Sequence, residues 1–199
     1  MAYELKSARY LAAEILRQAV ASGDVVVDAT MGNGHDTLTL CGLVGETGRV
    51  YAFDIQPAAV EATRQRLETA GMLNRAELFC LGHEHMSEKI SRPVKAVVFN
   101  LGWLPGADHR VTTRTETTLS AVQQALELLE PMGVLVVCVY PGHGEGLREK
   151  ETLTGFLAGL SPREYNVLQQ TFPNAGPEAP LCFAVQKQRS AGRDHGNEA

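Results

Sequence analysis

The first apolar run of the chain ends in a polar, glycine-rich segment, Asp28-Ala-Thr-Met-Gly-Asn-Gly-His-Asp36. Its two glycines allow a sharp turn and a close approach of the backbone to a ligand. A dinucleotide-binding turn would carry Gly or Ala where Thr37 stands, and the carboxylate of Asp28 would repel a pyrophosphate. The same carboxylate would attract a ligand that carries an amino group and a sulfonium. The segment therefore favours S-adenosylmethionine over NAD as cofactor.

An acidic residue at the end of the next apolar run supports a nucleoside cofactor. Asp54 follows the glycines by about 20 residues, the spacing at which an acid accepts hydrogen bonds from a ribose diol. Gln56 lies close behind and can contact the ribose or the adenine edge. An acid here would also suit NAD, and the first segment has a structural alternative, in which Asp28 only caps a strand–helix turn. The expected cofactor-binding residues of both segments are Asp28, Gly32, Asn33, Gly34, His35, Asp36, Asp54 and Gln56.

The third apolar run is followed by Gly82-His83-Glu84-His85, a group of titratable side chains. We expect Gly82 and His83 to contact the adenine, and an exposed surface loop is the alternative. A metal site is a further possibility, but two histidines and one Glu lack a third ligand at a recognised spacing. We therefore predict no metal.

The fourth apolar run ends in Asn100-Leu-Gly-Trp103-Leu-Pro-Gly, which is similar to the Asn-Pro-Pro-aromatic motif of amino-group methyltransferases. Leu-Gly replaces Pro-Pro, so the match is partial. In that chemistry the Asn side chain and the next backbone carbonyl accept hydrogen bonds from the target nitrogen, and the aromatic ring stacks on the base. Asn100, Leu101 and Trp103 are therefore the predicted catalytic residues. A tight turn with Trp103 packed on the domain is the alternative.

These groups must be positioned by strands that alternate with amphipathic helices. Continuous apolar runs such as 25–28 and 94–99 are typical of strands buried on both faces. The alternation predicts an α/β, Rossmann-like class I methyltransferase fold, with a seven-stranded, mostly parallel sheet and helices on both faces. The Pro-rich connection 172–180 is too short for a crossover helix, so the last strand should be antiparallel. Strands are expected at 25–28, 49–53, 75–81, 94–99, 134–140, 164–171 and 181–186, and helices at 5–19, 35–44, 57–70, 119–129 and 146–159.

The length of 199 residues suits one domain, which we place at 1–187, with a polar tail at 188–199 that we expect to be disordered. The net charge of −5 argues against a broad basic surface and tight non-specific binding of nucleic acid. No apolar run approaches the roughly 20 residues that cross a bilayer, and the N-terminus lacks the pattern of a signal peptide. We therefore predict a cytoplasmic protein that does not bind membranes.

Four motifs in this order resemble one bacterial family, known as putative rRNA methylases: Asp-Ala-Thr-x-Gly-Asn-Gly, Phe-Asp-Ile-Gln, Gly-His-Glu and Phe-Asn-Leu-Gly-x-Leu-Pro-Gly. The resemblance runs from about residue 25 to 185 and includes Pro-Gly-His-Gly-Glu-Gly at 141–146. His35, Trp103 and Pro141 stand where the family usually has Asn, Tyr and His. The resemblance implies that Asn33, His35, Asp54, Gln56 and His83 line the cofactor.

Characterised members of that family are tRNA methyltransferases. They transfer a methyl group from S-adenosylmethionine to the exocyclic amine of 5-aminomethyl-2-thiouridine at the wobble position, giving 5-methylaminomethyl-2-thiouridine. The resemblance thus implies a tRNA anticodon loop as the partner, and it suggests a homodimer.

The predicted reaction needs a neutral amine and contacts to RNA. An alkylamine is protonated near pH 7, so it must lose a proton before it attacks. His109 and His143 are candidate proton acceptors, and Asp28 and Asp36 could attract the ammonium form. Arg110 and Arg114 can contact phosphates, although a solvated loop explains them equally well. The predicted substrate-binding residues are Trp103, His109, Arg110, Arg114 and His143.

Other functions remain open on the residues alone. Methylation of rRNA or of a small-molecule amine uses the same groups. An NAD-dependent oxidoreductase is disfavoured by Asp28 and Thr37. A non-catalytic RNA-binding module is disfavoured by the intact cofactor loop, by Asn100 and by the lack of a broad basic face.

Overall fold

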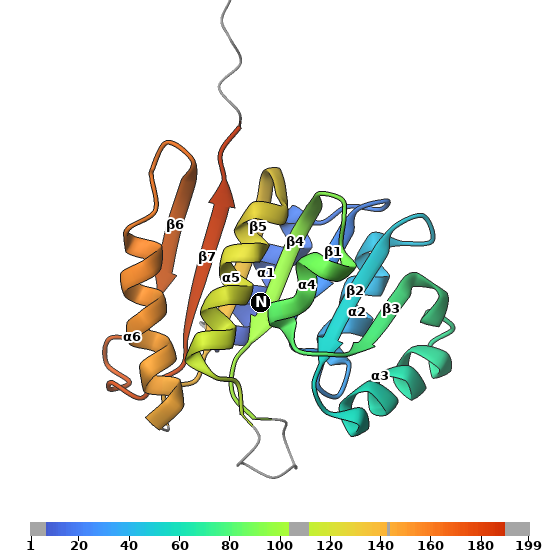
Figure 1. Ribbon diagram of the computed structural model, residues 1–199, viewed down its shortest axis with the longest axis horizontal. Helices are drawn as coiled ribbons and strands as arrows, with labels where there is room; N and C mark the ends of the chain where they lie inside the picture. The colour runs from blue at the N-terminus through green and yellow to red at the C-terminus, as the bar shows by residue number, and fades with distance from the viewer. Residues whose placement is uncertain (1–6, 104–111, 143, 190–199) are drawn as a thin grey trace, which may run out of the picture.

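The computed structural model describes residues 7–103, 112–142 and 144–189, and it contains the predicted seven-stranded sheet. The strand order is β3-β2-β1-β4-β5-β7-β6 (Figure 1). Strands β1 to β5 pair in parallel, and β7 is antiparallel to both of its neighbours, as predicted from the short Pro-rich connection. The strands are β1 (Val25–Asp28), β2 (Arg49–Asp54), β3 (Ala76–Cys80), β4 (Val94–Asn100), β5 (Leu129–Val139), β6 (Tyr165–Gln170) and β7 (Leu181–Lys187).

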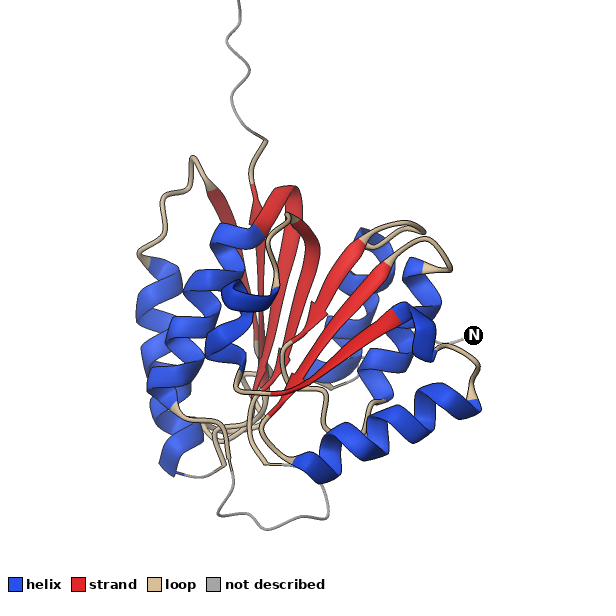
Figure 2. Cartoon of the chain, turned by 45° about the vertical axis from the view of Figure 1, so that its right-hand side comes forward, coloured by secondary structure: helices blue, strands red, loops and turns tan. Residues whose placement is uncertain are grey.

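Helices cover both faces of the sheet (Figure 2). Residues of α1, α2 and α3 pack on one face, and residues of α4, α5 and α6 pack on the other. None of the helices in the described part of the chain has the length and apolarity needed to cross a membrane. The helices are α1 (Ala8–Ala19), α2 (His35–Val44), α3 (Pro57–Thr69), η1 (Leu73–Arg75), η2 (His83–His85), α4 (Met86–Lys89), α5 (Thr115–Leu128) and α6 (Gly144–Ala158).

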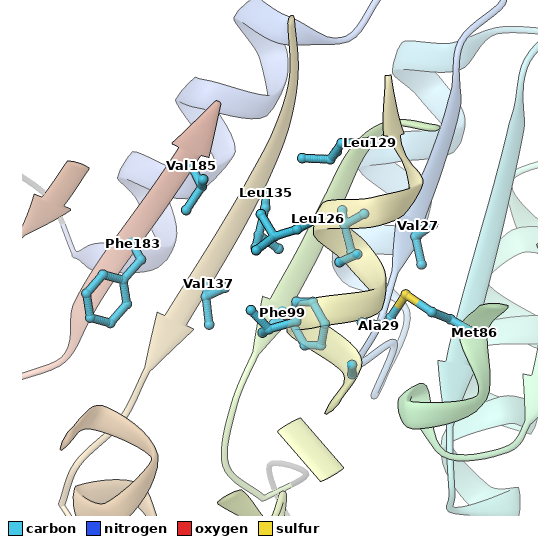
Figure 3. Packing of buried hydrophobic residues seen from close by; sticks show 14 of the residues in the cluster. Val27, Ala29, Met86, Phe99, Leu126, Leu129, Leu135, Val137, Phe183 and Val185 are labelled. Atoms are coloured by element: carbon cyan, nitrogen blue, oxygen red, sulfur yellow. The ribbon is translucent and has the colours of Figure 1, made fainter. Parts of the chain in front are cut away.

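The core explains why the central strands are apolar throughout. On β4, Val97 and Phe99 face the side of α5, while Val98 faces the side of α1. Figure 3 shows Phe99 among the side chains of neighbouring elements, including Leu126 of α5 and Met86 of α4. Each fully buried side chain of this size contributes about 1.5–3 kcal/mol of hydrophobic stabilisation. The two packed faces together hold the carboxyl end of β4 in place.

Strand β5 and the short helices η1, η2 and α4 differ from the sequence prediction. Strand β5 begins at Leu129 rather than at 134, because Pro131-Met132-Gly133 forms an irregularity within the strand instead of a break before it. Met132 has a positive φ of 65°, and the register with β4 shifts between Val94 and Ala96. The short helices η1, η2 and α4 were not predicted, because segments this short carry no helical periodicity. Of the predicted tail, residues 190–199 lie outside the described part.

Close packing between two helices dictates the shape of the β1–α2 loop, residues 29–34. Gly34 precedes α2 with a left-handed φ of 76°. A Cβ atom on Gly34 would lie 2.8 Å from both Cα and Oγ1 of Thr63 on α3. The Thr63 hydroxyl in turn donates a hydrogen bond to the Gly32 carbonyl over 2.9 Å. Helix α3 therefore supports this loop from behind.

We predict that Gly34→Ala lowers the free energy of unfolding by about 3 kcal/mol, through backbone strain and the clash with Thr63. Gly42→Ala is the matched control. It lies within α2, and a Cβ atom there meets nothing within 4 Å, so this change should stabilise the protein by about 1 kcal/mol. Urea unfolding of the two variants tests whether the free energy of unfolding falls for Gly34→Ala and rises for Gly42→Ala. Equal stability of Gly34→Ala and the wild type would contradict the packing argument.

Candidate active site

A pocket of about 620 Å³ lies at the carboxyl ends of β1, β2 and β4, the lower edge of the sheet in Figure 1. This volume is in the range of small-molecule sites. The pocket brings together residues from the segments that follow the first four apolar runs of the sequence. The predicted residues on its wall are Gly32, Asn33, His35, Asp36, Asp54, Gln56, Gly82, His83, Asn100, Leu101, Trp103 and Arg114.

Asp28 lies behind the wall rather than in it. Its side chain is fully buried, and its two oxygens accept hydrogen bonds from the Thr37 hydroxyl over 2.6 Å and from the Thr30 N–H over 3.2 Å. Burial, with the nearby charge of Asp36, raises the pKa of Asp28 to about 7. The contact with a cofactor that the sequence predicted for Asp28 is therefore replaced by support of the loop, because the carboxyl is already enclosed by its own turn.

Gly34 is also absent from the wall, since its place is against α3. The predicted residues His109, Arg110 and His143 lie outside the described part of the chain.

Asp54 is held with both oxygens oriented. Its Oδ2 accepts a hydrogen bond from the Gly32 N–H over 3.1 Å, and its Oδ1 accepts one from the Gln56 N–H over 2.9 Å. Burial raises the pKa of this carboxyl above its usual value. Each carboxylate oxygen can accept more than one hydrogen bond. Both oxygens of Asp54 can therefore accept a further hydrogen bond from a ligand in the pocket.

His83 presents a neutral imidazole to the pocket. Its Nδ1 lies 3.1 Å from the Ala29 carbonyl, which can only accept, so Nδ1 carries the proton. Burial lowers the pKa of His83, and the ring packs edge-on against Phe99. The remaining nitrogen, Nε2, is then an acceptor. The described residues contain no group of three side chains that could hold a metal.

His35 and Asn33 are tied to α3 through a single arginine. Nε of Arg66 donates to the Asn33 carbonyl over 2.7 Å, and its Nη2 lies 3.2 Å from Nε2 of His35. His35, which replaces the usual Asn of the resembled family, thus keeps a hydrogen-bonding role at the rim of the pocket.

Asn100, at the end of β4, joins this strand to the β1–α2 loop and to the start of α2. Its backbone N–H donates to the Thr30 hydroxyl over 2.7 Å, and its Nδ2 donates to Oδ2 of Asp36 over 2.8 Å. Its Oδ1 is buried and has no hydrogen-bond partner in the structure. A buried carbonyl oxygen without a donor is unfavourable, which marks this atom as a site for a donor from a ligand.

The segment after Asn100 is clasped to the start of α5. The Gly102 N–H donates to the Thr113 hydroxyl over 2.9 Å, and the Thr113 N–H donates to the Gly102 carbonyl over 3.1 Å. The Thr113 hydroxyl donates a hydrogen bond to Oε2 of Glu149 on α6 over 3.0 Å. Trp103 pairs with Thr112 in the same short bridge. The clasp holds the Trp103 backbone beside Asn100.

Sequence reasoning missed several residues of the wall. Arg9 on α1 forms an ion pair with Asp36 over 2.7 Å. The sequence did not indicate this role, because an arginine at an exposed position of an amphipathic helix is ordinary. Tyr140 directly follows β5, so its place at a strand end could have identified it, and burial raises its pKa to about 12. Ile55 is 56% exposed on the wall, an apolar side chain that a bound ligand would cover.

Comparison with known proteins decides the family. The family model described as "Putative rRNA methylase" matches residues 50–186. A protein of Arabidopsis thaliana named "tRNA (mnm(5)s(2)U34)-methyltransferase, chloroplastic" is 40% identical over 195 residues, which cover 93% of this chain and 71% of the relative. The chain belongs to the putative rRNA methylase family.

Two solved structures support the family assignment. A putative rRNA methylase from Clostridium thermocellum is 40% identical, with a TM-score of 0.91 over 93% of this chain and 100% of that chain. A putative methyltransferase from Streptococcus mutans, solved in complex with SAH, is 34% identical, with a TM-score of 0.84 over 92% and 99% of the two chains. These matches confirm the predicted class I fold and a methyltransferase that depends on S-adenosylmethionine, and they exclude the NAD-dependent oxidoreductase.

The buried carboxyl of Asp28 should make the stability of this methylase fall as pH rises. Its pKa in the folded protein is raised from 3.8 to about 7, so its contribution to stability is fully present below about pH 4 and is lost as pH rises through about 7. Relative to Asp28→Asn, which stays neutral, the free energy of unfolding of the wild type should fall by about 3 kcal/mol between pH 5 and 8. Urea unfolding of both cofactor-free proteins measures the difference, and a difference that is constant with pH would contradict the prediction.

Proposed function

We propose that this methylase transfers a methyl group to the exocyclic amine of 5-aminomethyl-2-thiouridine at the wobble position of tRNA, giving 5-methylaminomethyl-2-thiouridine. The observation that carries the proposal is the buried, unpartnered Oδ1 of Asn100, a residue that lines the pocket together with Trp103. The name of the Arabidopsis relative supplies the substrate class. Methylation of rRNA or of a small-molecule amine would use the same atoms, and these are outcomes of the test below.

The residues of the cofactor half fit S-adenosylmethionine. Asp54 and Gln56 would hold the ribose, the loop from Gly32 to His35 would hold the amino-acid end, and the neutral His83 would accept a hydrogen bond. Ile55 offers an apolar surface for the adenine. When bound, the cofactor supplies a methyl group on a positively charged sulfur. The assignment of Asp54 to the ribose is the most constrained, because both of its oxygens are oriented by backbone N–H groups.

The residues of the acceptor half would orient the amine. Oδ1 of Asn100 and the carbonyl of Leu101 would accept its N–H groups, which aims the nitrogen lone pair away from them and toward the cofactor half. Trp103 would stack on the base. Positioning of this kind supplies a large share of the rate when the methyl donor is already reactive.

The RNA would contact the rim of the pocket. Arg114 is exposed at the start of α5 and lines the pocket, so its guanidinium is placed to meet a phosphate. His109, Arg110 and His143 keep their proposed substrate-binding roles on the sequence alone.

Three further predictions accompany the proposal, on the domain, the oligomeric state and the cellular location. Every described strand belongs to one sheet, which supports a single domain over 1–187. The homodimer rests on the family resemblance. The cytoplasmic location also stays a prediction, since the Arabidopsis relative is named as chloroplastic.

Asp54→Ala should weaken the binding of S-adenosylmethionine by about 100-fold or more, because two charge-assisted hydrogen bonds are lost. Asp24→Ala is a matched control, since Asp24 lies just before β1 at the opposite edge of the sheet, where it accepts a hydrogen bond from the Ala21 N–H. Isothermal titration calorimetry compares the two variants with the wild type. Unchanged affinity of Asp54→Ala would remove this residue from the cofactor site.

Nucleoside mass spectrometry tests the substrate. The tRNA of a strain without this gene should accumulate 5-aminomethyl-2-thiouridine, and the wild-type gene should restore the methylated product. A gene encoding Asn100→Ala should restore little of it, because loss of the orienting acceptor lowers turnover by about 100-fold. An unchanged tRNA profile would refute the tRNA substrate, and full restoration by Asn100→Ala would remove Asn100 from the mechanism.

A further inference from the structure

The side-chain amide of Asn100 has one end bound and one end free. Its Nδ2 donates to Asp36, while its Oδ1 is buried without a partner, and the residue lines the pocket. The two ends of an amide have nearly the same size, so rotation by a half turn would exchange them at little steric cost. Such a rotation would place N–H groups where an amine also presents N–H groups, and the hydrogen bond between them would be lost.

The carboxylate of Asp36 determines which end is free. A carboxylate can only accept hydrogen bonds, so it binds the NH₂ end of an amide and not the carbonyl end. Oδ2 of Asp36 lies 2.8 Å from Nδ2 of Asn100, a good length for a charge-assisted bond. The contact therefore directs the carbonyl oxygen of Asn100 away from Asp36.

Arg9 on α1 fixes the carboxylate in turn. Its Nη2 lies 2.7 Å from Oδ1 of Asp36, and its Nε lies 3.4 Å from Oδ2. A planar guanidinium that contacts both oxygens sets the plane of a carboxylate, which a single point charge would not do. The contact runs between α1 and the first turn of α2, so it joins two helices at the mouth of the pocket.

We propose that Asp36 and Arg9 are positioning residues that lock the Asn100 amide with its carbonyl oxygen toward the acceptor amine. The proposal rests on the proposed function to the extent that Asn100 receives the amine. It replaces the direct cofactor contact predicted for Asp36 with a role that acts through Asn100. It also implies that the ion pair leaves Asp36 poorly suited to hold an ammonium ion, because both of its oxygens already have donors.

Kinetics and calorimetry on a double-mutant cycle test the lock. Asp36→Asn is nearly isosteric, but its amide can either donate or accept, so it no longer selects one orientation of Asn100. We expect kcat to fall about 10- to 100-fold, while the Kd for S-adenosylmethionine stays within about threefold of the wild type. In the Asn100→Ala background, Asp36→Asn should cause no further loss of kcat, because the residue acts through Asn100.

Variants on α1 provide the matched comparison. Arg9→Ala should lower kcat in the same direction as Asp36→Asn. Arg17→Ala removes another arginine of α1, one that pairs with Glu14 on the surface and does not line the pocket, so it should leave kcat unchanged. Two outcomes overturn the proposal: a more than tenfold weaker cofactor affinity of Asp36→Asn with normal saturated kcat, or additive losses in the double variant.

A measurement on the cofactor-free protein separates the lock from the proposed function. The Asn100 side-chain amide is assigned in a ¹H–¹⁵N NMR spectrum by its absence from Asn100→Ala. The lock predicts slow hydrogen exchange of this amide in the wild type and faster exchange in Asp36→Asn, and equal exchange would overturn it. If the exchange differs but the wild type does not methylate the RNA, the proposed function fails while the lock stands.

Discussion

Three hydrogen bonds connect the end of β4 with the β1–α2 loop and with the first turn of α2. They hold the cofactor half and the acceptor half of the pocket in one geometry. The Ala29 N–H donates to the Val98 carbonyl, the Asn100 N–H donates to the Thr30 hydroxyl, and the Asn100 amide donates to Asp36. The first continues the parallel pairing of β1 and β4 past the end of β1. The other two use side chains to carry the contact into the site. A change in the loop therefore moves the acceptor residue as well as the cofactor residues.

This arrangement buries two carboxyl groups, and the fold stabilises them by a hydrogen bond to each of their oxygens. Asp28 and Glu149 are both buried, and burial raises the pKa of each. Asp28 meets the Thr37 hydroxyl and the Thr30 N–H, while Glu149 meets the hydroxyls of Thr113 and Thr118. Each carboxyl supports one side of the acceptor site from behind, Asp28 through Thr30 and Glu149 through the clasp at Gly102. Their partners are hydroxyl and amide donors rather than cations, so hydrogen bonds replace part of the hydration that burial removes.

The sequence predicted the sheet and most of the pocket because both depend on local pattern. Continuous apolar runs mark the central strands, and parallel strands bring their polar ends to one edge, so Asp54, His83 and Asn100 had to meet there. The burial of Asp28 behind the wall was not predicted, because charge complementarity was judged without burial, which only the packed turn reveals. Arg9 was missed because its partner lies 27 residues away, on another helix. The irregularity at Met132 was missed because proline and glycine also mark the end of a helix, here the helix predicted at 119–129.

The charges around Asn100 also bear on how an alkylamine loses its proton. Oδ1 of Asn100 is an acceptor without basic character, and Asp36, the carboxylate bonded to Asn100, is engaged by Arg9. His83, the histidine with the deepest burial on the described wall, uses its Nδ1 proton for the Ala29 carbonyl and faces the cofactor half. Ammonium and sulfonium charges about 4 Å apart would repel each other by about 4 kcal/mol at an effective dielectric constant of about 20. The described contacts of Asn100 therefore favour the neutral amine over the ammonium form, and His109 and His143 stay the candidate proton acceptors.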